Sequence, residues 1–133
     1  MPALFSLLLL DPRLRHARLI LALVLYAGVV IAGSIPGARA EVGVYATGLV
    51  LHGLTYAFLT LLWFFGSTGS APVRALKAVL AIGLMGAGDE LVQSFLPYRS
   101  GDVRDWMIDI TAALLTSTAL AVFLPRRDPL RQP

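Results

Sequence analysis

The sequence predicts an all-α membrane protein, a bundle of four transmembrane helices that forms a single domain over residues 1–133. Three observations predict this class. Of the 133 residues, 57% are hydrophobic and only 14% are charged, whereas about 25% of an ordinary soluble domain is charged. Four apolar stretches approach the ~20 residues that a helix needs to cross a bilayer. Basic residues flank these stretches, as they do at the ends of membrane helices.

The N-terminal part supplies the first span. Residues 3–10 are apolar but too few to cross a membrane, so we expect a short interfacial helix there. A polar collar from Asp11 to Arg18 leads into an uncharged run over residues 19–35, which Pro36 and Gly37 close. The first span is therefore predicted at residues 19–35.

The second and third spans carry the polar residues of interest. The second is predicted at residues 45–65 and contains His52. The third is less obvious, because only eleven uncharged residues precede Asp89 in its apolar run, too few to cross the hydrocarbon core. This span must therefore include Asp89 and Glu90, and we predict it at residues 78–96.

The last span is predicted at residues 106–124. Trp106 lies at its start, where an amphipathic ring is favoured at the membrane interface, and Asp109 lies just inside. The final ten residues are basic and polar, so a short disordered tail is expected after the span.

Orientation follows from the basic residues. Eight of the eleven Lys and Arg fall on one side of the predicted topology, in the N-terminal collar, the middle loop and the C-terminal tail. The other three are Arg39, Arg99 and Arg104. Because basic loops stay in the cytoplasm, both termini are predicted there, in a multi-pass protein of the cytoplasmic (inner) membrane.

The composition also excludes several classes of function. The chain has no cysteine, which removes disulfides and thiolate metal sites. Its net charge of +3 comes from residues that flank apolar runs, so no nucleic-acid partner is predicted. Acids and one intramembrane histidine could hold a hard cation, but there is no helical H-E-x-x-H pair. No metal and no cofactor are predicted.

Ionisable residues inside spans cost roughly 2.5–3.5 kcal/mol each, so a cluster of them indicates function. His52 and Asp89 each lie seven residues from the outer end of their span, which corresponds to ~10 Å of depth in both cases. We therefore expect their side chains to be close. The polar cluster predicted to be functional near the outer face comprises His52, Tyr56, Asp89, Glu90, Gln93, Arg99, Asp105 and Asp109.

Such a cluster suits more than one role. A histidine beside carboxyl groups can act in acid–base chemistry, in a proton relay or in headgroup binding. For Tyr56, Gln93 and Asp109, hydrogen bonding between helices is an equally good explanation. Catalytic roles are therefore not assigned to individual residues.

Residues 89–99, DELVQSFLPYR, followed by Asp102 and Asp105, resemble the signature of the VanZ-like family, membrane proteins named for a component associated with teicoplanin resistance. Residues 52–56, HGLTY, resemble the H-x-x-x-Y pattern of the family, and residues 34–36 add a further match. The resemblance implies a cell-envelope protein linked to glycopeptide susceptibility and antibiotic resistance.

Residues and resemblance together predict binding, or chemical modification, of an envelope lipid or lipid-linked precursor at the outer leaflet. The alternative is a non-catalytic module that acts through a membrane protein partner or as a homo-oligomer. A small transporter is a third reading, and it would require a dimer because the chain contains a single unit.

Overall fold

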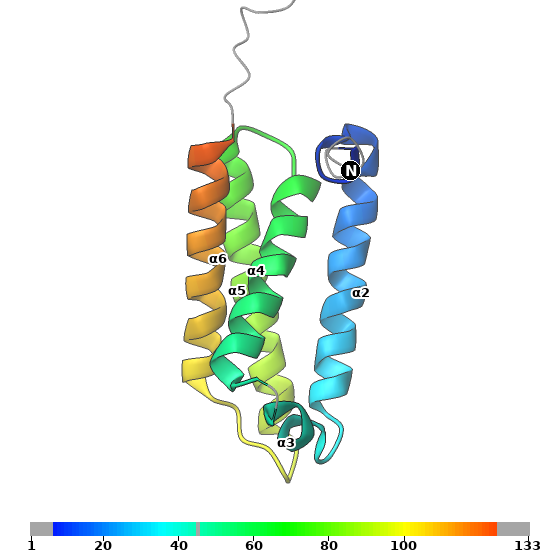
Figure 1. Cartoon of the computed structure of the whole chain (residues 1–133), viewed down its shortest axis with the longest axis vertical. Helices are drawn as coiled ribbons and strands as arrows, with labels where there is room; N and C mark the ends of the chain where they lie inside the picture. Colours follow the sequence, from blue (N-terminus) through cyan, green and yellow to red (C-terminus); the bar gives the residue numbers. More distant parts are fainter. Residues whose placement is uncertain (1–6, 45, 125–133) are drawn as a thin grey trace, which may run out of the picture.

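In the computed structural model of the chain, residues 7–44 and 46–124 are described, and their regular structure is helical. Four long helices run side by side (Figure 1): α2 (Arg15–Gly33), α4 (Gly48–Gly66), α5 (Ala71–Ser94) and α6 (Val103–Phe123). The 3-10 turn η1 (Pro12–Leu14) precedes α2, and the short helix α3 (Ala38–Gly43) connects α2 with α4.

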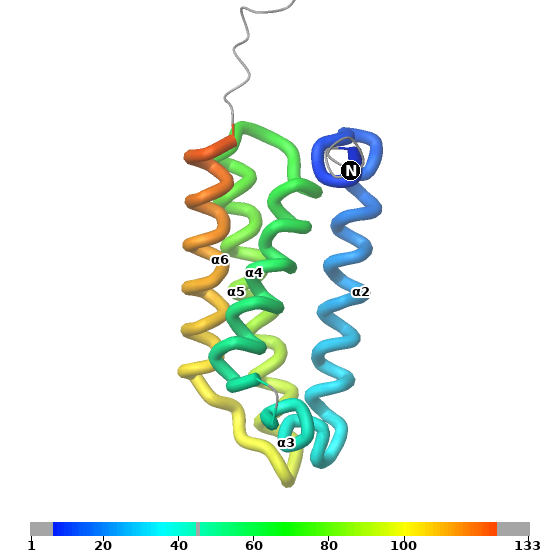
Figure 2. The backbone as a smooth tube through the Cα atoms, in the orientation of Figure 1, coloured from blue at the N-terminus to red at the C-terminus, as the bar shows by residue number. Residues whose placement is uncertain are grey.

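The helices pack as a bundle in which α6 contacts both α4 and α5, while α2 packs mainly on α4 (Figure 2). One end of the bundle holds η1, the α4–α5 loop and the last turn of α6; we call it the η1 end. The opposite end holds α3 and the α5–α6 loop and is the α3 end. The all-helical prediction is confirmed for the described residues.

Helix α2 begins at Arg15, four residues before the predicted start of the first span, and ends at Gly33 instead of residue 35. The early start is explained by Arg18, which is only 5% exposed. Its guanidinium donates hydrogen bonds to the carbonyl oxygens of Leu8 (2.7 Å), Asp11 (2.8 Å) and Phe65 (3.0 Å). A basic residue whose N–H donors are hydrogen-bonded can lie inside a helix. The charge of Arg18 therefore did not mark the start of α2.

Helix α5 also begins before residue 78, the predicted start of the third span. Helix α5 begins at Ala71, with a proline in its first turn, where a missing N–H is tolerated. Arg74 Nε donates to the carbonyl of Phe64 at 2.9 Å, and Lys77 Nζ donates to that of Thr68 at 3.0 Å. These two charges lie on the helix, not in the loop before it.

Other parts of the chain differ from the prediction or lie outside the described residues. Residues 36–44, expected as a loop, contain α3, which starts after Gly37 in a left-handed conformation with φ 82°. Residues 7–10 of the expected interfacial helix are helical. Residues 1–6, Tyr45 at the predicted start of the second span, and the predicted tail after Leu124 lie outside the described residues.

Three helical segments are long and apolar enough to cross a membrane: Pro12–Gly33, Gly48–Gly66 and Val103–Phe123. Helix α5 is not among them, and it carries two basic and two acidic residues. Large apolar side chains face outward, such as Leu84 (75% exposed) and Leu115 (68%), whereas Asp109 is fully buried. Apolar outside and polar inside is the arrangement expected of a bundle in lipid.

Glycines on α5 allow close contact with α2 and α6. A Cβ added at Gly86 would lie 2.7 Å from Asp109 Oδ2 and 3.1 Å from Trp106 Cδ1 on α6. A Cβ at Gly88 would lie 2.6 Å from the hydroxyl of Tyr26 on α2. Neither site can accept a side chain without displacing a neighbouring helix or residue.

We predict that Gly86→Ala lowers the stability of the purified protein by about 1–3 kcal/mol, because the added methyl overlaps Asp109. Gly53→Ala is the matched control, since a Cβ there meets nothing within 4 Å. The control should be neutral or slightly stabilising, because Ala favours a helix over Gly by ~1 kcal/mol. Thermal unfolding in detergent measures both. Equal melting temperatures for the two variants would contradict the close approach of α5 and α6.

Candidate functional site

A histidine on α4 meets a buried acid on α6. His52 Nδ1 and Asp109 Oδ1 form a hydrogen bond of 2.9 Å. The Asp109 side chain is fully buried, and that of His52 is 13% exposed. Because a buried carboxyl needs a polar partner, this contact explains how α6 accommodates an acid in its interior. The direct partner of His52 is therefore Asp109, whereas depth predicted only that Asp89 lies close to His52.

A second acid of α6 lies one helical turn nearer the α3 end. Asp105 Oδ2 is 3.7 Å from His52 Nε2, so the two nitrogens of the imidazole face two carboxyl groups. Arg39 Nη2, from α3, donates to the same Asp105 oxygen at 3.1 Å. The Arg39 side chain is 46% exposed, so this part of the site reaches the surface.

Asp89 joins the same group of residues through a tyrosine. The Tyr56 hydroxyl donates to Asp89 Oδ2 at 3.3 Å, and both residues are buried. The Tyr56 ring stacks on the His52 ring, with centroids 5.9 Å apart and planes 9° from parallel. Tyr56 thus connects the acid of α5 to the histidine of α4, and the spacing of four residues on α4 produces the stack.

The end of α5 carries the remaining predicted residues. Glu90 Oε2 accepts a hydrogen bond of 2.6 Å from the backbone N–H of Asp102, in the loop before α6. Arg99 donates to the buried amide oxygen of Gln93. Arg99 was the arginine predicted to belong to the polar cluster. Among the described residues, the arginine within ion-pair distance of an acid is instead Arg39, because α3 carries it over α6.

The structure therefore brings the predicted residues to the α3 end of the bundle and adds two groups that sequence reasoning missed. These are the Arg39 guanidinium and the Asp102 amide. Arg39 lies in a segment too short to show helical periodicity, so only its charge was visible in the sequence. A backbone amide has no sequence signal. We call His52, Asp89, Glu90, Asp105 and Asp109 the acidic cluster.

Several polar atoms in this region are buried without a hydrogen-bond partner among the described residues. They are Glu90 Oε1, Asp109 Oδ2 and Arg99 Nε. Unsatisfied acceptors are rare inside proteins, because each costs roughly 1–3 kcal/mol. The two free carboxyl oxygens mean that the acidic cluster has acceptor capacity that the protein does not use.

One subset of the cluster has the geometry of a cation site. Ligand atoms of His52, Glu90 and Asp105 lie within 4.8 Å of one another. A nitrogen and two carboxyl oxygens could hold a divalent ion such as Zn²⁺. However, Arg39 already contacts the Asp105 oxygen, so an ion would compete with that guanidinium. The donor set is compatible with a cation, but the protein supplies a positive charge of its own.

We predict that His52→Leu destabilises the protein by about 3–5 kcal/mol, because it leaves Asp109 buried without its partner. The double variant His52→Leu/Asp109→Leu should recover most of this loss, since apolar replacement of a whole buried pair is often neutral. Chemical denaturation in mixed micelles measures the free energy of unfolding of the wild type and of both variants. If the single and double variants were equally destabilised, the two side chains would not be energetically coupled.

Comparison with known proteins agrees with the motif. The VanZ/LLP1 family model matches residues 28–124, which include α4, α5, α6 and the acidic cluster. No curated protein and no solved structure gives a match. Because the family model covers most of the chain, this protein belongs to the VanZ/LLP1 family, as the DELVQSFLPYR segment indicated.

Proposed function

We propose that this VanZ-like membrane protein binds the polar headgroup of an envelope lipid or lipid-linked precursor at the acidic cluster. The observation that carries the proposal is the pair of buried carboxyl oxygens without partners, Glu90 Oε1 and Asp109 Oδ2. A ligand that donates hydrogen bonds to such oxygens would offset the desolvation of the acids. Glu90 is the better placed of the two, because it is only partly buried and lies beside the loop before α6.

The charges of the cluster restrict the class of headgroup. Four carboxyl groups share this region with one histidine, while Arg39 is held by Asp105 and Arg99 by Gln93. Bare phosphate would be repelled by the four acids. A headgroup with N–H or O–H donors, such as an ammonium group or a sugar, is complementary. The proposed ligand is therefore a donor-bearing headgroup.

The proposed topology follows from the basic residues and places α5 across the membrane as a fourth span. Its charges support this, because Asp89 is buried against Tyr56 and Arg74 is bonded to a carbonyl near the η1 end. The α3 end would then face outward from the cytoplasmic membrane. Binding of an envelope lipid there would account for the link to teicoplanin susceptibility that the resemblance implies.

The proposal is restricted to binding because Ser94, the last residue of α5, is already engaged. Ser94 Oγ donates to the carbonyl of Leu91 at 2.6 Å, and so has no activating base. The acids and His52 are held by one another and by Tyr56, which favours recognition over proton transfer to a substrate.

We predict that the protein in detergent binds dioleoyl-phosphatidylethanolamine more tightly than dioleoyl-phosphatidylcholine. Both lipids are zwitterionic, but only the first carries ammonium N–H donors. Glu90→Gln should reduce this preference by about tenfold, since a bond between charged partners contributes ~1.5–3 kcal/mol. The amide oxygen can keep the Asp102 bond, while its NH₂ replaces the free acceptor. Native mass spectrometry measures lipid retention.

The control for this experiment is Glu41→Gln, which removes the same charge from an exposed position on α3. It should leave the preference unchanged. Equal retention of the two lipids by the wild type, or an equal loss in both variants, would refute headgroup binding at the cluster. Glycosyl-diacylglycerol, which presents hydroxyl donors, extends the test to sugar headgroups.

The topology makes a separate prediction. The chain has no native cysteine, so single cysteines can be introduced without background. Val44→Cys and Ser100→Cys, both exposed at the α3 end, should react with a membrane-impermeant thiol reagent added to spheroplasts. Thr68→Cys, exposed in the α4–α5 loop, should react only after the membrane is opened. The reverse pattern of labelling would overturn the orientation.

A further inference from the structure

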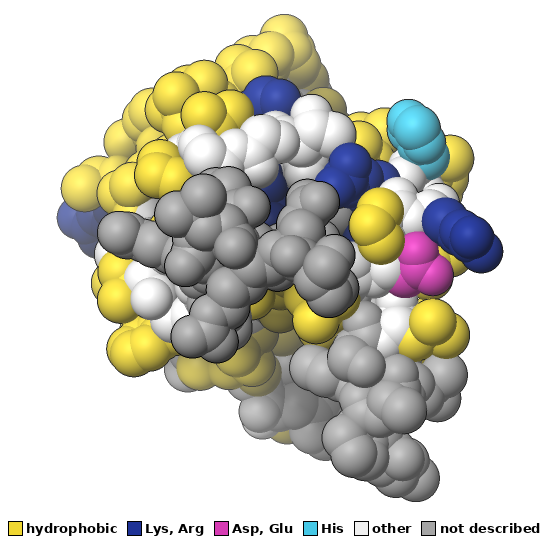
Figure 3. Space-filling model, turned by 90° about the horizontal axis from the view of Figure 1, so that it is seen from above, with side chains coloured by type: hydrophobic (Ala, Val, Ile, Leu, Met, Phe, Trp, Pro, Cys, Tyr) yellow, Lys and Arg dark blue, Asp and Glu magenta, His cyan; other side chains and the backbone are white. Residues whose placement is uncertain are grey.

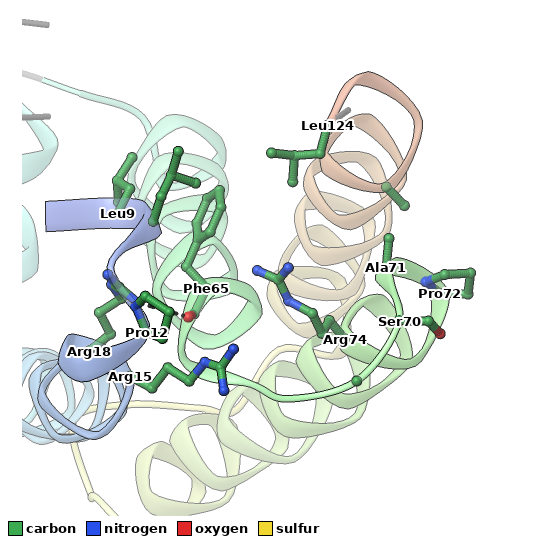
Figure 4. Close-up of a pocket in the computed structure, with 13 residues that line it drawn as sticks. Leu9, Pro12, Arg15, Arg18, Phe65, Ser70, Ala71, Pro72, Arg74 and Leu124 are labelled. Carbon is green, nitrogen blue, oxygen red and sulfur yellow. Dashed lines mark hydrogen bonds between the residues drawn. The ribbon is translucent and has the colours of Figure 1, made fainter. Parts of the chain in front are cut away.

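A pocket of about 750 Å³ lies at the η1 end, far along the bundle from the acidic cluster. It is formed where η1 and the start of α2 face the α4–α5 loop and the last turns of α6. Figure 3 views this end and shows dark blue basic side chains among yellow apolar ones. The residues that matter for binding are Leu9, Arg15, Arg18, Phe65, Arg74 and Leu124 (Figure 4).

Two of the three arginines are fixed by the fold. Arg18 is bound to three carbonyl oxygens, as described above. Arg74 donates through Nε to the carbonyl of Phe64, and its guanidinium lies 4.3 Å from the centroid of the Phe64 ring. These contacts leave the terminal NH₂ groups of Arg74 to face the pocket from α5, while Arg15 extends toward the same space from α2 (Figure 4).

The three arginines of the pocket outnumber the acids near them in the described part of the chain, where Asp11 lies close to Arg18. The described contacts between acidic and basic side chains involve Asp105 and Asp109, and both of these acids lie at the α3 end, away from the pocket. Asp11 is the acid near the pocket, and its carboxyl accepts a hydrogen bond from the backbone N–H of Arg13. The start of α5 also lines the pocket and has no side-chain cap at Ser70, so its dipole adds positive potential. An anion would compensate these charges.

The walls indicate that the anion carries an apolar part. Leu9, Phe65 and Leu124 surround the space into which the arginines point (Figure 4). The volume is within the ~300–1,000 Å³ of ligand sites, enough for a headgroup and the first part of an acyl chain. Basic pockets between membrane helices are also a known setting for anionic headgroups. A small soluble anion would leave the apolar walls without a partner.

We propose that this pocket binds the phosphate group of an anionic membrane lipid, with Arg15 and Arg74 contacting the phosphate and the lipid chains lying against Leu9, Phe65 and Leu124. The site differs from the acidic cluster in position and in charge. Its proposed ligand does not depend on the ligand proposed for the acidic cluster. The bundle would then hold two lipids of opposite preference at its two ends.

The test measures binding of dioleoyl-phosphatidylglycerol and dioleoyl-phosphatidylcholine to the full-length protein by native mass spectrometry. Phosphatidylglycerol should bind more tightly, and Arg15→Gln should weaken it about fivefold, the contribution of one basic residue near an anionic headgroup. Arg15 is chosen because no hydrogen bond to another described residue depends on its side chain. Arg13→Gln is the control, since Arg13 is exposed at the same end but does not line the pocket.

A second variant tests the apolar part without changing charge. Ala121 lines the pocket, and Ala121→Phe should fill it and weaken phosphatidylglycerol binding while the melting temperature is retained. Inorganic phosphate at the same concentration should not displace the lipid. If Arg13→Gln and Arg15→Gln had equal effects, only the general surface charge would be at work and the site would be refuted. Displacement by inorganic phosphate together with no effect of Ala121→Phe would identify a free-phosphate site instead.

Discussion

The hydrogen bond between His52 and Asp109 connects α4 to α6, and the way α5 packs depends on the same carboxyl. Asp109 is fully buried, so its carboxyl group cannot turn toward solvent. Gly86 leaves room for this side chain between α5 and α6, and any larger residue would displace it. In a bilayer no water satisfies such a group, so its partners must come from neighbouring helices. Three helices therefore meet at one acid, and Tyr56 and Asp89 extend the contact.

The bundle separates opposite charges along its length. Carboxyl groups converge at the α3 end, where Arg39 compensates part of their charge and His52 contacts two of them. Arginines converge at the η1 end, where backbone carbonyls bind them without neutralising them. The two proposed binding sites therefore differ in charge. The apolar middle, with Leu59 and Ile82 buried, separates the two regions.

Much of this fold could be predicted from the sequence, because long apolar runs with glycine and proline at their ends locate helices to within a few residues. The start of α5 could not be predicted, because Arg74 and Lys77 were assigned to the loop before it. Only the structure shows the backbone carbonyls that bind these two side chains. Depth arithmetic correctly placed His52 and the acids at one end. It could not choose between Asp89 and Asp109 as the partner of His52, because that choice depends on how each helix is rotated about its axis. The contact of Arg39 with Asp105 could not be predicted either, because it depends on α3, and no periodic pattern in the sequence predicted that helix.

The sequence separation of the His52–Asp109 pair has a consequence for biosynthesis. The two residues are 57 positions apart, and α6 is the last of the described helices to be synthesised. When α4 and α5 have emerged from the ribosome, Tyr56 and Asp89 can already meet, but His52 lacks both of its carboxyl partners. Polar groups without partners are unfavourable in lipid. The polar face of α4 therefore gains the carboxyl partners of His52 only once α6 has been synthesised.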